Sequence, residues 1–475
     1  MAPPVAQQHD AGIFLRLSRS RTMAHRAAGS LLRNNQILGG IGMANKTGST
    51  LLAVISLIAV VGCSSSEPAQ TAGTETKAPP APSNEPVTLS ILFDTGVPTD
   101  AEFDEIYVKP LKQKYPNITL QRVTGKIEEM VAAKTVPDII YSFTGRMYLY
   151  DNLKILQDMT ALAKKNGFDV NRIDPVVLDS IYLTKPGQLM AIPFAMNFGA
   201  LYYNTDLFDK FGVSYPSDGL TWDQTIDIGK RLTRVDGGVQ YRGFHAYGLT
   251  RMQRVIGNTY YDPKTLKGTL TSPEWKFIFD TFMKIYTIPG NETKNPPTDG
   301  GDGPFMKEKV LAMLASNNYF PQLEVATKDG LNWDVAQFPS LPQRPNVFTD
   351  VDAHQFVIPN TTKHMDAAMQ AIATFTSEDV QLLGARKYAK LSPLKDPKFK
   401  QQLGADLPYL KGKKIASIFK SSIGISPFRD EYAGQAGTIL NDEFLQAYQG
   451  KKDINSALRD ADERLNKYIA ENPKK

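Results

Sequence analysis

From residue 87 onward, short segments rich in β-branched residues alternate with segments whose apolar residues recur at helical spacing. Residues 87–93 (VTLSILF), 118–123 (ITLQRV) and 136–141 (VPDIIY) have the composition of strands. Residues 101–115 lie between the first two, with Phe103, Ile106, Tyr107, Leu111 and Tyr115 near helical spacing. This order of strands and helices predicts an α/β fold with a largely parallel sheet flanked by helices.

Three further helices are marked by their ends or their pattern. Residues 221–224 (TWDQ) fit a capping box, in which the Thr221 hydroxyl and the Gln224 side chain each accept a backbone N–H. Ser272, Pro273 and Glu274 offer a capping residue, a first-turn proline and an acid near the positive end of the helix dipole. Residues 454–468 repeat apolar residues on one face and predict a final amphipathic helix.

A different apolar pattern precedes the folded part. Residues 51–61 form an apolar run interrupted only by Ser56, which is too short to cross a bilayer but suits the core of a secretory signal. The next residues, Val60-Val61-Gly62-Cys63, resemble a bacterial lipobox. The resemblance implies that Cys63 is diacylated and becomes the mature N-terminus, giving a palmitate-bearing lipoprotein at the extracytoplasmic face of the cell membrane. The alternative is a buried structural cysteine behind a signal anchor.

The regions around this signal are predicted to lie outside the fold. Residues 43–62 read as the signal peptide, with Met43 and Lys46 as its start, and residues 1–42 as a spurious or non-structural extension. A twin-arginine leader is disfavoured because residues 1–42 contain no paired arginines. Residues 63–86 comprise the lipidated cysteine and a flexible tether rich in Ser, Ala, Pro and Thr.

Charge and cysteine content change the interpretation of the mature chain. The whole sequence carries 54 Lys+Arg and 49 Asp+Glu, but residues 1–62 hold six of the bases and one of the acids. The remainder therefore has 48 of each and no net charge, so the basic balance of the full sequence gives no reason to expect nucleic acid as a partner. Because Cys63 is the only cysteine, the fold contains no disulfide and depends on packed cores.

Several segments in a fixed order resemble the extracellular solute-binding proteins of family 1, which serve ABC importers. They include residues 187–194 (GQLMAIPF), 200–212 (ALYYNTDLFDKFG), 305–314 (FMKEKVLAML) and 333–335 (WDV), and the helix pair ending in Ser377-Glu378-Asp379-Val380-Gln381. The resemblance covers most of residues 87–475, a length that itself predicts two domains. Its ordered combination is far more specific than any single segment.

The resemblance implies a type II periplasmic-binding-protein-like fold, with two lobes that close on a solute. Lobe 1 would combine residues 87–200 and 354–402, and lobe 2 residues 201–353 and 403–475, with hinge crossings near residues 200, 352 and 403. The implied partners are a small solute, most often an oligosaccharide, and an ABC permease in the membrane. A monomer without a cofactor is expected. Closure requires that the solute bind the closed state more tightly than the open one.

Ligands of open α/β sheets bind beyond the carboxyl ends of strands, so residues at such ends are the candidate ligand contacts. A sugar site also needs flat aromatic faces beside hydrogen-bonding groups. We expect Trp222 and Trp333 to be structural and Trp275 to be partly exposed, whereas Tyr203, Asn204 and Phe208 serve packing and a turn. Many sugar receptors of this type carry a tryptophan where this chain has Asn317-Asn318-Tyr319. The predicted ligand-binding residues are Phe93, Asp94, Tyr141, Ser142, Asn197, Tyr247, Asn317, Tyr319, Asp352 and His354.

Other functions are weighed against this one. The sequence lacks the His-Glu-x-x-His, Gly-x-Ser-x-Gly and Gly-rich phosphate-loop motifs, and the oxygen-rich residues 298–303 lack calcium-loop spacing. We therefore expect no catalysis and no metal, although a polysaccharide-active enzyme with two carboxylates stays open by inspection. A sensor lipoprotein feeding a receptor kinase would use the same fold. An anchored adhesin or peptide scaffold would instead show a large exposed apolar patch.

Overall fold

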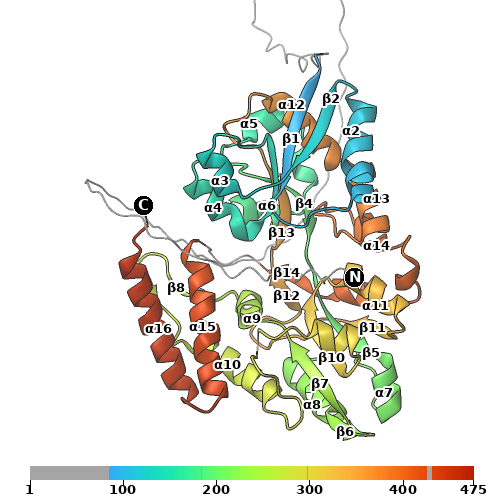
Figure 1. Ribbon diagram of the computed structural model, residues 1–475, viewed down its shortest axis with the longest axis vertical. Coiled ribbons are helices and arrows are strands. Elements are labelled where there is room, and N and C mark those ends of the chain that lie inside the picture. Colours follow the sequence, from blue (N-terminus) through green and yellow to red (C-terminus); the bar gives the residue numbers. More distant parts are fainter. Residues whose placement is uncertain (1–84, 183–184, 297, 425–429, 475) are drawn as a thin grey trace, which may run out of the picture. The chain divides into compact units, whose positions relative to one another are not determined.

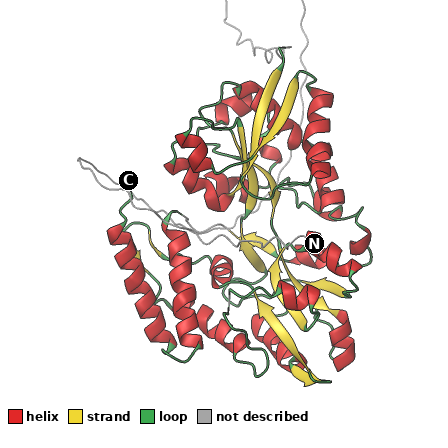
Figure 2. Cartoon of the chain, viewed as in Figure 1, coloured by secondary structure: helices red, strands yellow, loops and turns green. Residues whose placement is uncertain are grey.

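The computed structural model describes residues 85–182, 185–296, 298–424 and 430–474 (Figure 1). The predicted extension, signal peptide and lipidated Cys63 lie outside these ranges, as does almost all of the tether. The described part is built on two five-stranded sheets with helices packed around them (Figure 2). The α/β class and the flanking helices are as the sequence predicts.

The first sheet has the strand order β2-β1-β3-β13-β4. Its strands are β1 (Val87–Phe93), β2 (Ile118–Val123), β3 (Ile139–Phe143), β4 (Ile192–Met196) and β13 (Ala353–Val357). The first two match the predicted ranges, whereas β3 begins only after Pro137 and Asp138. Strand β1 runs parallel to both β2 and β3, but β13 is antiparallel to β3 and β4.

The second sheet has the order β11-β5-β10-β7-β6. Its strands are β5 (Gly199–Asn204), β6 (Arg234–Asp236), β7 (Val239–Ala246), β10 (Leu311–Asn317) and β11 (Trp333–Ala336). Only the β7–β10 pair in this sheet is parallel. Both sheets are therefore mixed, because β5 and β13, which enter their sheets from other parts of the fold, run against the direction of their neighbours. Two short pairs, β8 (Tyr261–Asp262) with β9 (Lys267–Gly268) and β12 (Val347–Asp350) with β14 (Ser422–Gly424), complete the strands.

The chain leaves and re-enters the first sheet through two short crossings. Asn197 and Phe198 lead from β4 of the first sheet to β5 of the second, and Val351 and Asp352 lead from β12, in the short β12–β14 pair, to β13 of the first sheet. Since β4 and β13 are neighbours in the first sheet, the two crossings start side by side. Asn197 N–H donates to Asp352 O at 3.0 Å and ties one crossing to the other.

Helices cover both faces of the first sheet. On one face, Leu92 and Ile140 pack with Ile127 and Tyr150; on the other, Ile91 and the adjoining strands pack against the remaining helices. This follows from the alternation of side chains along a strand, which sends neighbours to opposite faces. The helices in this part are α1 (Asp100–Phe103), α2 (Lys109–Lys114), α3 (Ile127–Ala132), α4 (Met147–Asn152), α5 (Thr160–Lys165), α6 (Pro175–Tyr182), α12 (Met365–Phe375), α13 (Glu378–Tyr388) and α14 (Lys398–Gln401).

The predicted helix over residues 101–115 is continuous but not uniform. A π-helical turn at Asp104–Val108 separates α1 from α2, with Lys109 N–H bonding to Asp104 O. Pro110 stands directly after this turn; it has no N–H to donate, and its ring would clash with a carbonyl one turn back. The wider turn accommodates the proline within the helix.

Among the remaining helices, the predicted caps have mixed outcomes. These helices are α7 (Thr205–Phe211), α8 (Trp222–Leu232), α9 (Leu249–Ile256), α10 (Pro273–Tyr286), α11 (Phe320–Lys328), α15 (Tyr432–Tyr448) and α16 (Ile454–Glu471). The capping box of Thr221 and Gln224 is confirmed at the start of α8. Ser272 occupies the capping position of α10, but its side chain accepts no bond from that helix; Asn258 Nδ2 donates to it at 3.4 Å instead.

The three tryptophans are all buried. Trp222 and Trp333 are 4% and 2% exposed and are structural, as predicted. The expectation that Trp275 is partly exposed is wrong: it is fully buried, stacks on Tyr260 and donates its indole N–H to Thr259 O at 3.1 Å. Tyr260 and Thr259, which precede β8, contact Trp275, and α16 packs against α10. Tyr203, Asn204 and Phe208 are buried as well, and Asn204 caps α7.

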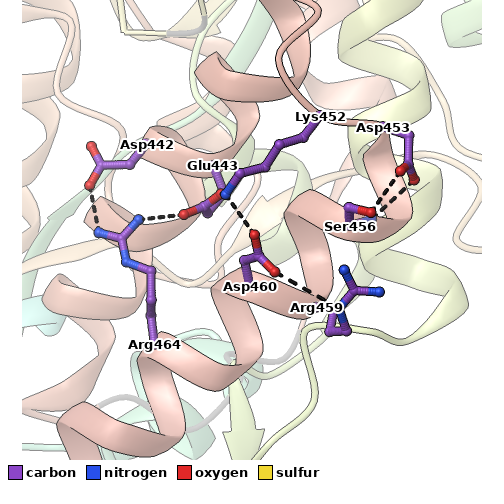
Figure 3. Close-up of polar contacts among 8 residues, drawn as sticks. All are labelled: Asp442, Glu443, Lys452, Asp453, Ser456, Arg459, Asp460 and Arg464. Carbon is purple, nitrogen blue, oxygen red and sulfur yellow. Dashed lines mark hydrogen bonds and ion pairs between the residues drawn. The ribbon is translucent and has the colours of Figure 1, made fainter.

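A network of charges joins α15 to α16 (Figure 3). Glu443, whose side chain is only 5% exposed, accepts from Lys452 Nζ at 2.6 Å and from Arg464 NH1 at 2.7 Å. Lys452 also bonds to Asp460, and Arg464 to Asp442, so each cation bridges two carboxylates. A buried carboxylate is tolerated here because two cations compensate it.

Candidate functional site

The carboxyl end of β1 carries Asp94, the centre of a polar cluster at the edge of the first sheet. Its Oδ2 lies 2.8 Å from Arg146 Nε, accepts from Ser142 Oγ at 3.3 Å and makes a short hydrogen bond with the Tyr150 hydroxyl. Burial, and then the charge of Asp94, raise the pKa of the Tyr150 phenol well above its usual range, so this group stays a donor. Asp94 is thus held in place by three neighbours, and its side chain is 10% exposed.

Three predicted residues form an aromatic contact series beside this cluster. Phe93 and Tyr141 end neighbouring strands with ring centroids 5.2 Å apart, and both are buried. His354 on β13 stacks on Tyr141 at 5.6 Å with an interplanar angle of 25°. Phe93 also packs against Phe103 and therefore reaches into the core of the first sheet.

The two crossings supply polar atoms with spare hydrogen-bonding capacity. Asn197 Nδ2 donates to Asp352 Oδ2 at 3.2 Å and lies 3.5 Å from His354 Nε2. Asp352 Oδ1 and His354 Nδ1 are buried and have no partner among the described residues. Burial and the nearby Lys390 lower the pKa of His354, while Asp352 opposes them. A neutral imidazole beside a carboxylate can both accept and donate hydrogen bonds to hydroxyl groups.

The parallel strands β7 and β10 bring a second group together at the edge of the other sheet. Tyr247 follows β7, Asn317 ends β10 and Tyr319 follows it. The buried Tyr202 fixes this turn: its hydroxyl donates to Asn317 O at 2.9 Å and accepts from Tyr319 N–H at 3.1 Å. Tyr247 is 37% exposed and so offers an accessible aromatic face.

Helix α9 connects the second group to the crossings through Arg251 and Arg254, two residues that the sequence analysis did not predict. Arg251 NH1 makes a short hydrogen bond to Asn317 Oδ1, and its guanidinium lies 5.1 Å over the Tyr247 ring. Arg254 NH1 lies 4.0 Å from Asp352 Oδ2. Tyr247, Gly248, Arg251 and Asn317 also line one small pocket.

The ten predicted residues therefore fall into two groups. The first group contains seven residues that contact one another in series: Phe93, Asp94, Tyr141, Ser142, Asn197, Asp352 and His354. The second group contains Tyr247, Asn317 and Tyr319. The residues missed are Arg146, Tyr150, Arg251 and Arg254. A usable signal existed for two of them, since Arg251 and Arg254 lie three apart on a helix that begins directly after a strand end.

Within residues 85–182, 185–296, 298–424 and 430–474, no cluster of three or more His, Cys, Asp or Glu side chains is arranged to hold a metal ion. None of the helices in the described ranges combines the length and apolar content needed to cross a bilayer.

A family model identifies most of the folded part. The model for the bacterial extracellular solute-binding proteins matches residues 96–382. Two curated relatives match more locally: the sn-glycerol-3-phosphate-binding periplasmic protein UgpB of Agrobacterium fabrum is 27% identical over 123 residues, and a mannitol-binding protein of Pseudomonas aeruginosa is 28% identical over 204 residues. These matches cover 26% and 38% of this chain and span only 28% and 45% of the respective relatives.

Solved structures share the fold over more of the chain. An ABC substrate-binding protein from Listeria monocytogenes in complex with cycloalternan has a TM-score of 0.66 at 18% identity, covering 81% of this chain and all of that one. A cyclic α-maltosyl-1,6-maltose binding protein from Arthrobacter globiformis has a TM-score of 0.64 at 14% identity, covering 82% and 100%. At these identities the likeness establishes the fold, which is the type II periplasmic-binding-protein-like fold.

Proposed function

The chain belongs to the bacterial extracellular solute-binding proteins, and from that premise we propose that it captures a carbohydrate and delivers it to an ABC permease. The solute would lie between the strand ends of the two sheets. Residues 87–200 with 354–402 would act as one lobe, and residues 201–353 with 403–475 as the other. The family consists of binding proteins rather than enzymes, which disfavours the alternative of a polysaccharide-active enzyme.

The observation that carries this proposal is the placement of the hydrogen-bonding groups. Asp352 Oδ1 and His354 Nδ1 are buried without partners in the described part of the chain, at the start of β13 and beside Asn197 of the other crossing. Unpaired buried polar atoms cost free energy unless a ligand or water satisfies them. A polyhydroxylated solute supplies donors and acceptors to both atoms and leaves its apolar face for Tyr247.

The ligands named for similar proteins support the same class. Glycerol 3-phosphate, mannitol, cycloalternan and a cyclic maltosyl-maltose are each named for one of them, and all carry several hydroxyl groups. An oligosaccharide is the solute we propose here. Since all three tryptophans are buried, tyrosines would provide its stacking surfaces.

A thermal-shift screen of the purified protein tests the solute class. Neutral and uronate-bearing mono- and oligosaccharides form the test set, with peptides and polyamines as controls. A solute that binds the native state raises the melting temperature, because it stabilises that state by about 2.7 kcal/mol at a hundredfold excess over Kd. A shift with saccharides alone supports the proposal, and a shift with peptides or polyamines alone overturns it.

We also propose that Cys63 is the lipid attachment site, on the basis of its position in Val60-Val61-Gly62-Cys63. The diacyl chains would anchor the protein at the extracytoplasmic face of the cell membrane, since two chains give stable anchoring where one does not. Replacing Cys63 with Ala should move the protein from the membrane fraction to the soluble fraction without changing its affinity for solute. Retention of the variant in the membrane fraction would refute the anchor. The alternative role as a sensor subunit predicts a requirement for a receptor kinase instead of a permease in cells.

A further inference from the structure

Arg251 is fixed by neutral groups at the centre of the proposed site. Its guanidinium lies over the Tyr247 ring at 5.1 Å and bonds to the side-chain oxygen of Asn317. Both neighbours stand at the carboxyl ends of the parallel strands β7 and β10. The position of this cation is therefore set by the fold and does not depend on a flexible surface side chain.

The other arginines of the site are already paired with carboxylates. Arg146 lies 2.8 Å from Asp94, and Arg254 lies 4.0 Å from Asp352. Arg251, by contrast, donates to an amide oxygen, which carries no charge. Among these three arginines, Arg251 is the one without a carboxylate at ion-pair distance in the described residues.

The charge of Arg251 is in an unfavourable environment. Burial and the nearby Arg254 lower the pKa of Arg251, while Asp352 only partly opposes them. A partly buried guanidinium is stabilised best by an oxyanion, to which it can donate two parallel hydrogen bonds. The uncompensated charge of Arg251 is satisfied when the solute itself brings such an oxyanion.

We propose that Arg251 selects acidic saccharides, in which a carboxylate or phosphate binds the guanidinium while the sugar hydroxyls bind the crossings. This inference rests on the proposed function and adds the charge class of the solute. Arg251 is then a specificity-determining residue, and Tyr247 and Asn317 position it.

Titration calorimetry with matched solutes tests this inference. One pair is a neutral disaccharide and the same disaccharide with its terminal sugar oxidised to a uronate; the other is a sugar and its phosphate ester. We expect the acidic member of at least one pair to bind ten or more times more tightly, with the two pairs separating carboxylate from phosphate recognition. Raising the salt concentration should weaken the acidic solute and leave the neutral one almost unchanged.

The variant Arg251→Gln keeps a hydrogen-bond donor and removes the charge. It should lower affinity for the acidic solute at least tenfold and for the neutral solute less than threefold. Arg231→Gln, an exposed arginine on α8, is the matched control and should change neither. The salt dependence of the unmodified protein gives a second measurement that does not depend on the variant folding.

The outcomes separate the two proposals. Equal affinity for neutral and acidic members, with no salt dependence, overturns the selection of acidic saccharides while carbohydrate binding stands. Loss of both affinities to the same extent in Arg251→Gln overturns the role of its charge. Binding of peptides or polyamines in place of every saccharide overturns the proposed function itself.

Discussion

Helix α8 lies directly on strand β7, and the contact depends on two glycines. A Cβ atom built on Gly243 would lie 1.8 Å from Gly229 O, which is backbone against backbone. Gly243 N–H also donates to Thr233 Oγ1 at 3.0 Å, at the end of the same helix. Replacing Gly243 with Ala therefore requires the helix and the strand to separate.

The magnitude follows from the distance. Non-bonded heavy atoms rest at about 3.5 Å or more, so α8 would have to withdraw by roughly 1.7 Å. Overpacking of this kind costs about 1–3 kcal/mol, and the stretched hydrogen bond to Thr233 adds about 1 kcal/mol. We expect Gly243→Ala to lower the free energy of unfolding by about 3 kcal/mol. Gly229→Ala should cost less, because its Cβ would lie 2.8 Å from the Cβ of Phe244, a side-chain atom.

Urea unfolding followed by tryptophan fluorescence measures the change, since Trp222 begins α8 and reports on its packing. The matched control is Gly434→Ala in α15, where an added Cβ meets nothing within 4 Å. That variant should be neutral or more stable by up to about 1 kcal/mol, because alanine restricts the unfolded chain. A Gly243→Ala protein that unfolds at the urea concentration of the unmodified protein would refute the close contact of α8 with β7.

Three further predictions concern stability. Glu443→Ala should lower the free energy of unfolding in urea by about 2–3 kcal/mol, less than the loss of an isolated buried pair, because Lys452 and Arg464 each keep a second carboxylate. The control Glu471→Ala removes an exposed pair at 3.9 Å and should lower it by under about 0.5 kcal/mol. Equal losses of stability in the two variants would contradict the network. Thr221→Ala should cost about 1 kcal/mol and Thr221→Ser almost nothing, so equal losses would exclude the hydroxyl cap. Burial lowers the pKa of His245 to about 3, so between that value and pH ~6.5 the unfolded chain binds a proton that the native state does not. The free energy of unfolding should therefore fall by up to about 1.4 kcal/mol per pH unit from pH ~6.5 downward, and His245→Gln should reduce this slope. The slope would be absent if the native state bound this proton equally well.

Local patterns predicted the elements well where neighbours in sequence determine them. Strands β1 and β2 and the capping box of α8 depend on alternation and on a four-residue motif. The prediction for Ser272 failed because Asn258, distant in sequence, donates to its hydroxyl in the fold. Trp275 was misplaced for a similar reason: its exposure is set by Tyr260 and α16, which local sequence does not specify.

The candidate site was predictable only in part. Strand ends can be located from sequence, so Asp94 and Asn317 could be nominated before the structure, and Asp352 could be nominated from the hinge that the resemblance implies. Arg146 could not, because its ion pair with Asp94 joins residues that are brought together by tertiary structure. The mixed strand directions could not be predicted either, since they depend on where the chain enters and leaves each sheet.

The central claim is that groups at the strand ends and crossings hold a saccharide. Calorimetric titration of the saccharide that raises the melting temperature, into the unmodified protein and into Tyr247→Ala, Asp352→Asn and Tyr215→Ala, tests it most directly. Tyr215 is the matched control, because it is 42% exposed, similar to Tyr247, but bonds to Asp209 away from the site. The account predicts at least tenfold weaker binding for the Tyr247 and Asp352 variants and unchanged binding for the Tyr215 variant. Equal affinity in all four proteins would contradict it.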